Sequence, residues 1–300
     1  TLLAPGDDAA VVAAPDGRVV VSTDVLVEDR HFRRRWSSGQ DVGWRAAMQN
    51  LADIAAMGAR PTSLVVALVV PAELPVSWVE GLARGLGAAC GPVGVGVVGG
   101  DLSGGDQVVV SVAAHGDLGG RAPVLRSGAR PGDVLAFAGV QGRSAAGLAL
   151  LDAGRPEVDD DLLRAHRRPA PPLAAGPEAA VAGATAMLDV SDGLLRDAGR
   201  LARASGAVLE LADPAQAFAA DLAATAGAAG ALGVDPLVWV LTGGEDHGLL
   251  ASFRPDAVLP ATFRVVGRVV GPGGGRAPGD VAVAGGGVLP AGVGWDHFSR

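Results

Sequence analysis

Lysine and tyrosine are both missing from this 300-residue chain, and cysteine occurs only once. Because all 24 basic residues are arginine, the chain cannot use a Walker-A lysine, a Schiff-base lysine or a protein-kinase strand lysine. A single cysteine, Cys90, excludes an intramolecular disulfide and a cysteine-cluster metal site. Its small apolar neighbours indicate a packed structural thiol.

Positive charge is also scarce, since the formal net charge is −8. This balance argues against a nucleic-acid-binding surface, although bound metal ions could still attract an anionic substrate. Apolar runs such as 64–70 are strand-sized, so no membrane-spanning segment is expected, and no signal peptide is recognisable. We therefore expect a cytoplasmic protein without nucleic-acid or membrane partners.

What the chain does contain is an alternation of strand and helix patterns, which is typical of an α/β fold. In the first half, strands are expected at 18–23, 64–70, 93–98 and 108–114, and helices at 41–57 and 75–89. The run Gly94–Gly99 matches the dinucleotide fingerprint GxGxxG. We reject that match because its glycines alternate with valines inside an expected strand, which Gly99-Gly100-Asp101 should end with a turn.

A stretch rich in glycine, arginine and proline at 119–132 marks the expected domain boundary. We divide the chain into residues 1–125 and 126–300. In the second half, strands are expected at 134–138, 186–190, 208–211, 238–241 and 264–270, and helices at 144–151, 193–205 and 215–232. A polar, proline-rich crossing is expected at 153–177, and a loop with one short strand at 271–287.

Short acidic motifs among small residues are the most informative feature. They are Gly6-Asp7-Asp8, Ser22-Thr23-Asp24, Asn50-Leu51-Ala52-Asp53, Gly99-Gly100-Asp101 and Leu188-Asp189-Val190-Ser191-Asp192-Gly193. In an α/β fold, strand ends can bring such positions to one edge of a sheet. Converging carboxylates are tolerable only around cations, and hard oxygen ligands with a phosphate-bearing substrate suggest Mg²⁺. The expected ligands are Asp8, Asp24, Asp53, Asp101, Asp189 and Asp192.

Simpler roles stay open for several of these residues. Asp192 is alternatively the N-cap of the helix expected at 193–205. The hydroxyls of Ser22, Thr23 and Ser191 suit Mg²⁺ or phosphate, or they form turns. The guanidinium of Arg126 lies in a glycine-rich loop, which suits either phosphate binding or a solvated linker.

Two further segments are candidates for ligand contacts. His31 lies in a polar segment shortly after Asp24. The run 242–246 follows an expected strand, and its glycines allow a ligand to approach closely, unless it is an ordinary tight turn. His115, His166 and His247 fall in no recognisable catalytic spacing and stay unassigned.

Taken together, these segments resemble the thiamine-monophosphate kinase family over nearly the whole chain. The segments that carry the resemblance are 6–11, 22–28, 31–32, 50–58, 99–101, 126–129, 188–195, 241–246 and 294–298. The first-half motifs are shared with a wider superfamily of ATP-using enzymes, which includes aminoimidazole-ribonucleotide synthetase, selenophosphate synthetase and a hydrogenase maturation factor. The Ser191–Leu194, Gly243–Asp246 and Asp296–Phe298 segments resemble the kinase branch specifically.

The resemblance implies ATP-dependent conversion of thiamine phosphate to thiamine diphosphate by direct in-line phosphoryl transfer, assisted by several Mg²⁺ ions. It implies metal ligands at Asp8, Ser22, Thr23, Asp24, Asp53, Asp101, Asp189 and Asp192, of which Asp24, Asp53, Asp101 and Asp192 are the expected catalytic residues. It places ATP near Gly100, Asp101, Arg126 and Ser191, and the substrate near His31, Glu245 and Trp295.

The resemblance also implies a fold. Residues 1–125 would form an α+β domain that binds ATP and Mg²⁺ and whose mainly β core pairs across a homodimer. Residues 126–300 would form a three-layer α-β-α domain that completes the nucleotide and substrate site.

This chain departs from the family pattern at several positions. Asp29-Arg30 precede His31 where a glycine is frequent, Ala52 replaces a frequent serine, and His247 replaces a frequent tyrosine. Arg45 replaces a lysine, and we expect it at the surface. Two alternatives remain: a superfamily synthetase that activates an amide or carbonyl oxygen, and a non-catalytic nucleotide-binding module.

Overall fold

The computed structural model describes residues 13–284, 292 and 294–295 of the chain. These residues form two compact units. Of the described residues, unit 1 comprises 13–55, 59–122 and 167–169, and unit 2 comprises 56–58, 123–166 and 170–284 with 292 and 294–295. The main change of unit, between Ala122 and Pro123, falls close to the expected boundary. The first acidic motif, which contains Asp8, lies outside the described residues.

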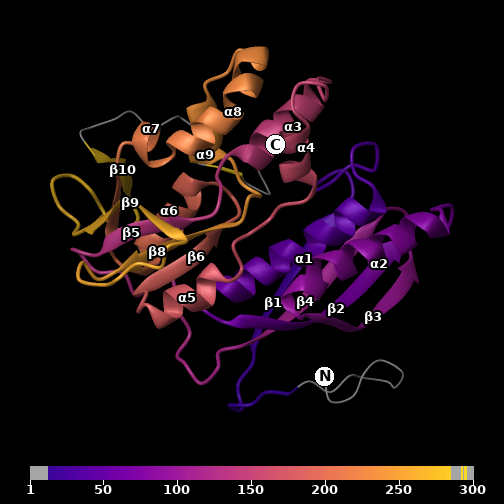
Figure 1. Ribbon diagram of the computed structural model, residues 1–300, viewed down its shortest axis with the longest axis horizontal. Coiled ribbons are helices and arrows are strands. Elements are labelled where there is room, and N and C mark those ends of the chain that lie inside the picture. The colour runs from indigo at the N-terminus through magenta and orange to yellow at the C-terminus, as the bar shows by residue number, and fades with distance from the viewer. Residues whose placement is uncertain (1–12, 285–291, 293, 296–300) are drawn as a thin grey trace. The chain divides into compact units, whose positions relative to one another are not determined.

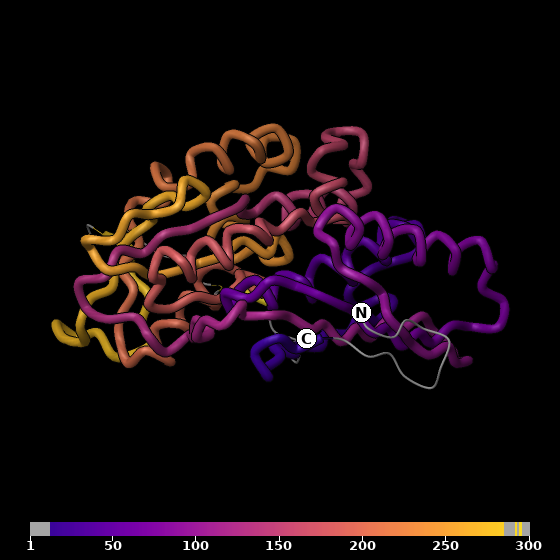
Figure 2. Tube along the Cα trace, turned by 60° about the horizontal axis from the view of Figure 1, so that its bottom comes forward, coloured from indigo at the N-terminus to yellow at the C-terminus, as the bar shows by residue number. Residues whose placement is uncertain are grey.

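Unit 1 is a four-stranded sheet with helices against one side (Figures 1 and 2). Its strands are β1 (Val20–Val27), β2 (Arg60–Val70), β3 (Gly96–Gly104) and β4 (Val109–Asp117), in the order β1-β4-β2-β3. Its helices are α1 (Gly39–Ala56), α2 (Val76–Cys90) and the short 3₁₀ helix η1 (Gly91–Val93). All pairs are antiparallel except β2 with β3, which is parallel.

Glycines allow α1 and α2 to pack almost backbone to backbone. A Cβ atom on Gly43 would come within 2.1 Å of the Leu82 carbonyl oxygen, and one on Gly85 within 2.1 Å of the Gln40 carbonyl oxygen. Any larger residue there would force the helices apart. Leu82, Leu86 and Ala89 of α2 are buried, and this close pair forms one cover for the sheet.

No helix in the described part of unit 1 covers the other side of this sheet, which we call the open face. Its residues include Val21, Thr23, Val25 and Val65. Val21 is 58% exposed and Val25 is 43% exposed. Alternate residues of the same strands, such as Leu26 and Leu64, are buried. A row of exposed valines across neighbouring strands is an unpartnered apolar surface.

Unit 2 is built on a mixed six-stranded sheet with the order β10-β7-β9-β5-β8-β6. The strands are β5 (Val134–Ala138), β6 (Ala186–Val190), β7 (Val208–Leu211), β8 (Gly248–Phe253), β9 (Phe263–Val270) and β10 (Val281–Val283). The helices are α3 (Arg143–Asp152), α4 (Asp160–Arg167), α5 (Ala175–Val181), α6 (Leu194–Ala204), α7 (Pro214–Ala217), α8 (Ala219–Leu232) and α9 (Pro236–Thr242).

Most of the unit 2 sheet is buried on both faces, although Val265 of β9 is exposed. Leu135 and Phe137 point into a core shared with α6 and α9, whereas Ala136 and Ala138 point into a core shared with α5. All residues of β6 and β8 are buried. This is the expected three-layer arrangement, and the α/β fold class is confirmed.

Several expected elements of unit 2 were wrong. Residues 238–241 form part of helix α9, which begins with Pro236 after the N-cap Asp235, whose carboxylate accepts a hydrogen bond from the Leu237 N–H. A short apolar run is ambiguous between strand and helix, and here this capping signal decides for helix. The strand β8 was missed, and the crossing at 153–177 contains α4 and the start of α5.

Two expectations for unit 1 were also wrong. The strand β3 does not end at Gly99-Gly100-Asp101 but runs through it to Gly104. Arg45 is 3% exposed rather than a surface residue. No helix opens within Gly94–Gly99, which agrees with our rejection of the dinucleotide fingerprint. Among the described residues, no helix combines the length and the apolar character that crossing a membrane requires.

Candidate active site

In unit 1, β1 and α1 bring three of the expected oxygen donors together. The Ser22 hydroxyl donates to Asp53 Oδ2 at 2.6 Å. The backbone N–H of Asp24 donates to Asn50 Oδ1 at 2.9 Å, and Gln49 Nε2 donates to Asp24 Oδ2 at 3.3 Å. We call Ser22, Asp24, Asn50 and Asp53 the β1–α1 cluster.

Two periodicities build this cluster. Ser22 and Asp24 are two residues apart on an edge strand, so both face the helix side of the sheet. Asn50 and Asp53 are three apart on α1, so they lie on one helix face. Asn50 is fully buried, and its Nδ2 also donates to the Ala46 carbonyl at 2.8 Å. The hydrogen bonds of this cluster hold the edge strand β1 to α1 at the Ser22-Thr23-Asp24 motif.

The structure does not bring Asp101 to this cluster within one chain. β1 and β3 are the two edges of the sheet, with β4 and β2 between them, a separation of roughly 14 Å at about 4.8 Å per strand. The register aligns Asp101 with Val25, whereas Asp24 aligns with Gly100. Asp101 and Thr23 therefore lie on the open face, and Asp24 lies on the helix face.

His31 lies in a tight segment between β1 and α1. Its Nδ1 accepts a hydrogen bond from the Val27 N–H at 3.0 Å. That nitrogen must then be unprotonated, so the proton is on Nε2, which is a hydrogen-bond donor. Asp29 has φ 62°, a left-handed conformation rare for a residue other than glycine. Asp29 therefore forms a tight turn just before His31.

Unit 2 positions a second acidic group at the end of β6. Asp189 Oδ2 lies 3.1 Å from His247 Nδ1, and both side chains are 5% exposed. Asp192 Oδ2 lies 2.6 Å from an Arg200 nitrogen. The N-cap alternative for Asp192 is wrong, because the N-cap of α6 is Gly193 and no side chain caps the helix.

Asp197 and Arg200 complete the surroundings of Asp192. The backbone N–H of Asp192 donates to Asp197 Oδ2 at 2.9 Å, and Arg200 donates to Asp197 Oδ1 at 2.6 Å. Burial raises the pKa of the Asp197 carboxyl to about 6, opposed by the Asp192 N–H and the Arg200 charge. The sequence analysis missed both residues, because an Asp–Arg pair three apart on an amphipathic helix is typical of a solvated surface.

The 242–247 segment connects α9 to β8 and packs against Ser191. A Cβ on Gly244 would lie 2.0 Å from the Ser191 carbonyl oxygen, which accepts a hydrogen bond from the Glu245 N–H at 2.9 Å. Glu245 and His247 have φ 71° and 54°. Two left-handed residues other than glycine in one short turn store strain, which is frequent at functional sites. The turn leaves Glu245 partly exposed beside Ser191.

Asp246, between these two strained residues, points into the protein. Its Oδ1 accepts the Ser144 N–H at 2.9 Å, which places the carboxylate at the N-terminus of α3. Burial raises the pKa of Asp246 to about 7, opposed by the backbone N–H groups of Ser144 and Gly142. Buried Gln141 donates to the Gly243 carbonyl at 2.8 Å. These two residues, which the sequence analysis did not assign, hold the turn that presents Glu245.

Arg126 and Trp295 lie at opposite ends of α6. The Arg126 carbonyl accepts the hydroxyl of Ser205, the C-cap of α6. The backbone N–H of Trp295 donates to the Asp192 carbonyl at 2.8 Å, just before the first turn of α6. The helix has 11 residues and is therefore roughly 16 Å long. The Trp295 indole is 53% exposed, and Asp296–Phe298 of the same motif lie outside the described residues.

No group of three or more histidine, cysteine, aspartate or glutamate side chains in the described part of the chain is arranged to hold a metal ion. The donors still suit Mg²⁺, because Mg²⁺ is commonly bound by one or two carboxylates together with water and substrate phosphates. The β1–α1 cluster and the Asp189–Asp192 pair each offer two carboxylates of this kind.

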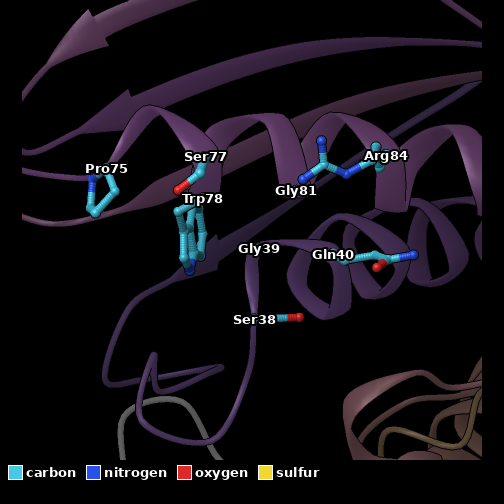
Figure 3. Close-up of a pocket in the computed structure, with 8 residues that line it drawn as sticks. All are labelled: Ser38, Gly39, Gln40, Pro75, Ser77, Trp78, Gly81 and Arg84. Carbon is cyan, nitrogen blue, oxygen red and sulfur yellow. The ribbon is translucent and has the colours of Figure 1, made fainter.

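A separate pocket of about 360 Å³ lies between the first turns of α1 and α2 (Figure 3). Its lining residues are Ser38, Gly39, Gln40, Pro75, Ser77, Trp78, Gly81 and Arg84. None of them is a predicted site residue. Asp53 lies 14 residues along α1 from Gly39, or roughly 20 Å. This pocket is therefore distinct from the acidic groups.

Comparison with known proteins identifies the family to which this chain belongs. A family model described as AIR synthase related protein, N-terminal domain, matches residues 6–118. A thiamine-monophosphate kinase of Mycobacterium tuberculosis is 55% identical over 90% of this chain and 79% of its own length. One from Corynebacterium glutamicum is 44% identical over 88% of this chain and 80% of its own length. This chain belongs to the thiamine-monophosphate kinase family.

Solved structures of the family have the same fold. A thiamine-monophosphate kinase from Aquifex aeolicus superposes with a TM-score of 0.80 at 32% identity, covering 94% of this chain and 92% of that one. A structure described as AaThiL complexed with AMPPCP and TMP gives a TM-score of 0.83 at 32% identity, covering 97% and 91%. These two structures thus share the fold of this chain over nearly its whole length, and the family resemblance is confirmed.

Proposed function

We propose that this chain transfers the terminal phosphate of ATP to thiamine monophosphate, giving thiamine diphosphate and ADP. Membership of the thiamine-monophosphate kinase family carries the proposal. It is supported by the solved relative that holds AMPPCP, an analogue of ATP that resists hydrolysis, together with TMP. The absence of lysine fits, because the site has to manage phosphate charge without a P-loop lysine.

The transfer makes one phosphorus–oxygen bond and breaks another. An oxygen of the thiamine phosphate attacks the terminal phosphorus of ATP, and the bridging oxygen leaves with ADP and keeps the bond electrons. Because the attacking phosphate is already an anion near neutral pH, no side chain has to remove a proton. The protein must instead bring two polyanions together in line.

Asp24, Asp53, Asp101, Asp189 and Asp192 would hold Mg²⁺, with the hydroxyls of Ser22 and Thr23, and Asp8 would join them. Bound Mg²⁺ would neutralise phosphate charge in the approach and in the transition state. The β1–α1 cluster supports this role, because hydrogen bonds from Ser22 and Gln49 already orient the Asp53 and Asp24 carboxylates.

The remaining site residues would bind the two substrates. Gly100, Asp101, Arg126 and Ser191 would contact ATP, with Arg126 and Ser191 meeting different parts of the nucleotide. His31 would donate from Nε2 to the phosphate of thiamine monophosphate. The Glu245 carboxylate and the half-exposed Trp295 indole suit the flat, cationic thiazolium ring.

The catalytic form would be a homodimer built on the open face of unit 1. A second copy is the occupant we favour, because the face is apolar and Asp101 lies on it at the edge opposite Asp24. A partner whose β3 lay beside β1 would bring its Asp101 near Thr23, which lies on the same face. Sedimentation at micromolar concentration should therefore give twice the chain mass, and a monomer would contradict this assembly.

The activity is tested by incubating the chain with ATP, MgCl₂ and thiamine monophosphate and separating the products by chromatography. Thiamine diphosphate and ADP should appear in equal amounts. ADP with inorganic phosphate, formed only when an amide or carbonyl substrate is added, would indicate the synthetase alternative. Nucleotide binding without turnover would indicate the non-catalytic alternative. The reaction uses soluble substrates, and we place the protein in the cytoplasm.

A further inference from the structure

Asp192 is held at both its backbone and its side chain by the same two residues. Its N–H donates to one oxygen of Asp197, and its carboxylate meets one nitrogen of Arg200. A second Arg200 nitrogen donates to the other oxygen of Asp197 at 2.6 Å. The three residues close a ring of charge-assisted contacts, which we call the Asp192 ring.

Anchoring α6 does not require this ring. The helix already buries Leu194, Leu195, Ala198, Leu201 and Ala202 against the sheet. Asp197 is 1% exposed, and a whole buried ion pair is often replaceable by apolar side chains without loss of stability. What an apolar residue could not do is fix the direction of the Asp192 carboxylate. Arg200 also places a positive charge among Asp189, Asp192 and Asp197.

We propose that Asp197 and Arg200 are positioning residues that fix the Asp192 carboxylate for Mg²⁺ and phosphate binding. The inference rests on the proposed role of Asp192. Residues that orient a metal ligand from behind commonly change metal affinity or activity by about 10–100-fold when they are removed. Asp197 is the central member, because it contacts both the backbone turn of Asp192 and the guanidinium that pairs with its side chain.

The test compares Asp197→Asn and Arg200→Gln with wild type in full-length protein. Asparagine keeps an acceptor for the Asp192 N–H but loses the charged contact with Arg200. We expect both variants to raise the Mg²⁺ concentration for half-maximal rate about tenfold, with the KM for thiamine monophosphate changed less than twofold. Arg200→Lys should recover part of the loss, because it restores the charge but not the two-pronged geometry.

A second readout does not need turnover. MgCl₂ alone should raise the Tm of wild type, and Asp197→Asn should require a higher Mg²⁺ concentration for the same rise. Arg203→Gln is the matched control, since Arg203 is an exposed arginine in the last turn of the same helix. It should leave both Mg²⁺ dependences unchanged.

Two outcomes would overturn the inference. Asp197→Asn and Arg200→Gln could lower the Tm while leaving both Mg²⁺ dependences at the wild-type values, which would reduce the ring to a helix support. Equal shifts in the Arg203→Gln control would show a general effect of charge instead. Failure of the proposed function looks different, because wild type itself would then form no thiamine diphosphate, while the Tm titration would still compare the variants.

Discussion

The two sheets of this protein differ in how many of their faces are covered by helices. In unit 2, helices cover both faces, so β6 and β8 are buried along their whole length. In unit 1, α1 and α2 cover one face, while the described residues leave valines of the other face exposed. The apolar core of unit 2 forms within one chain. The exposed valines on the open face of unit 1 would be buried only by contact with a second surface.

The acidic residues of the two units differ in a parallel way. In unit 2, Asp189 lies against His247 and Asp192 against Arg200, so each carboxylate has a basic neighbour close by. In unit 1, the Gln49 amide donates a hydrogen bond to Asp24, and the Ser22 hydroxyl donates one to Asp53. The variants below therefore ask in which of the two units the loss of one carboxylate also weakens a buried contact.

The largest expected effect tests this contrast. Asp53→Asn and Asp24→Asn should lower turnover about 10²–10³-fold, because each removes a carboxylate from the proposed multi-metal site. Without Mg²⁺ their Tm should hold or rise, since less negative charge is held together. Asp189→Asn should instead lower the free energy of unfolding without metal by roughly 1–3 kcal/mol, and the Tm with it, because it weakens a buried contact. Near-normal turnover of Asp53→Asn at saturating Mg²⁺ would contradict the proposal that Asp53 is a metal ligand.

The next effect tests the open face. Val65→Asp places a charge at the centre of this face, where a second copy would bury it, and should give a monomer with about tenfold or more lower activity. Val265→Asp is the matched control, on an exposed position of β9 in unit 2, and should change neither property. Sedimentation together with an activity assay measures both. A Val65→Asp dimer of full activity would show that the open face has another purpose.

A smaller effect is expected at the substrate side of unit 2. Trp295→Ala should raise the KM for thiamine monophosphate several-fold, because stacking and cation–π attraction contribute roughly 0.5–2 kcal/mol. The KM for ATP should stay nearly constant, and Trp295→Phe should recover most of the loss. If Trp295→Ala changes only the Tm, the residue ties the chain end to Asp192 and does not bind substrate.

The smallest effect concerns the buried Asp246. Its folded-state pKa is raised from 3.8 to about 7, so the folded state holds the proton more tightly than the unfolded state. Its contribution to stability is greatest below pH 4 and is lost as the pH rises to 7. Asp246→Asn cannot ionise and should gain roughly 1–2 kcal/mol over wild type at pH 8. Melting curves from pH 4 to 8 should show this gain shrink toward acid pH, and a constant difference would contradict it.

Local pattern was enough to find most elements and most chemical groups. Buried strands such as β5 and amphipathic helices such as α6 follow directly from the spacing of apolar residues. It failed at 238–241, where a short apolar run fits strand or helix equally well until the Asp235 cap is considered. The resemblance named Asp24, Asp53 and Glu245, but their hydrogen-bond partners came from elements distant in the sequence.

The sequence by itself determined the family, the α/β class, the lysine-free chemistry and the identities of the acidic residues, because each is written in composition or in short motifs. Only the tertiary structure decided which aspartates meet. Strand order and side-chain alternation separate Asp101 from Asp24, while the fold of α6 back onto the β6 turn joins Asp192 to Asp197 and Arg200. The first outcome is not local, because it depends on the order of the strands in the sheet. The second lies within residues 192–200 and depends on how the start of α6 turns back toward the end of β6.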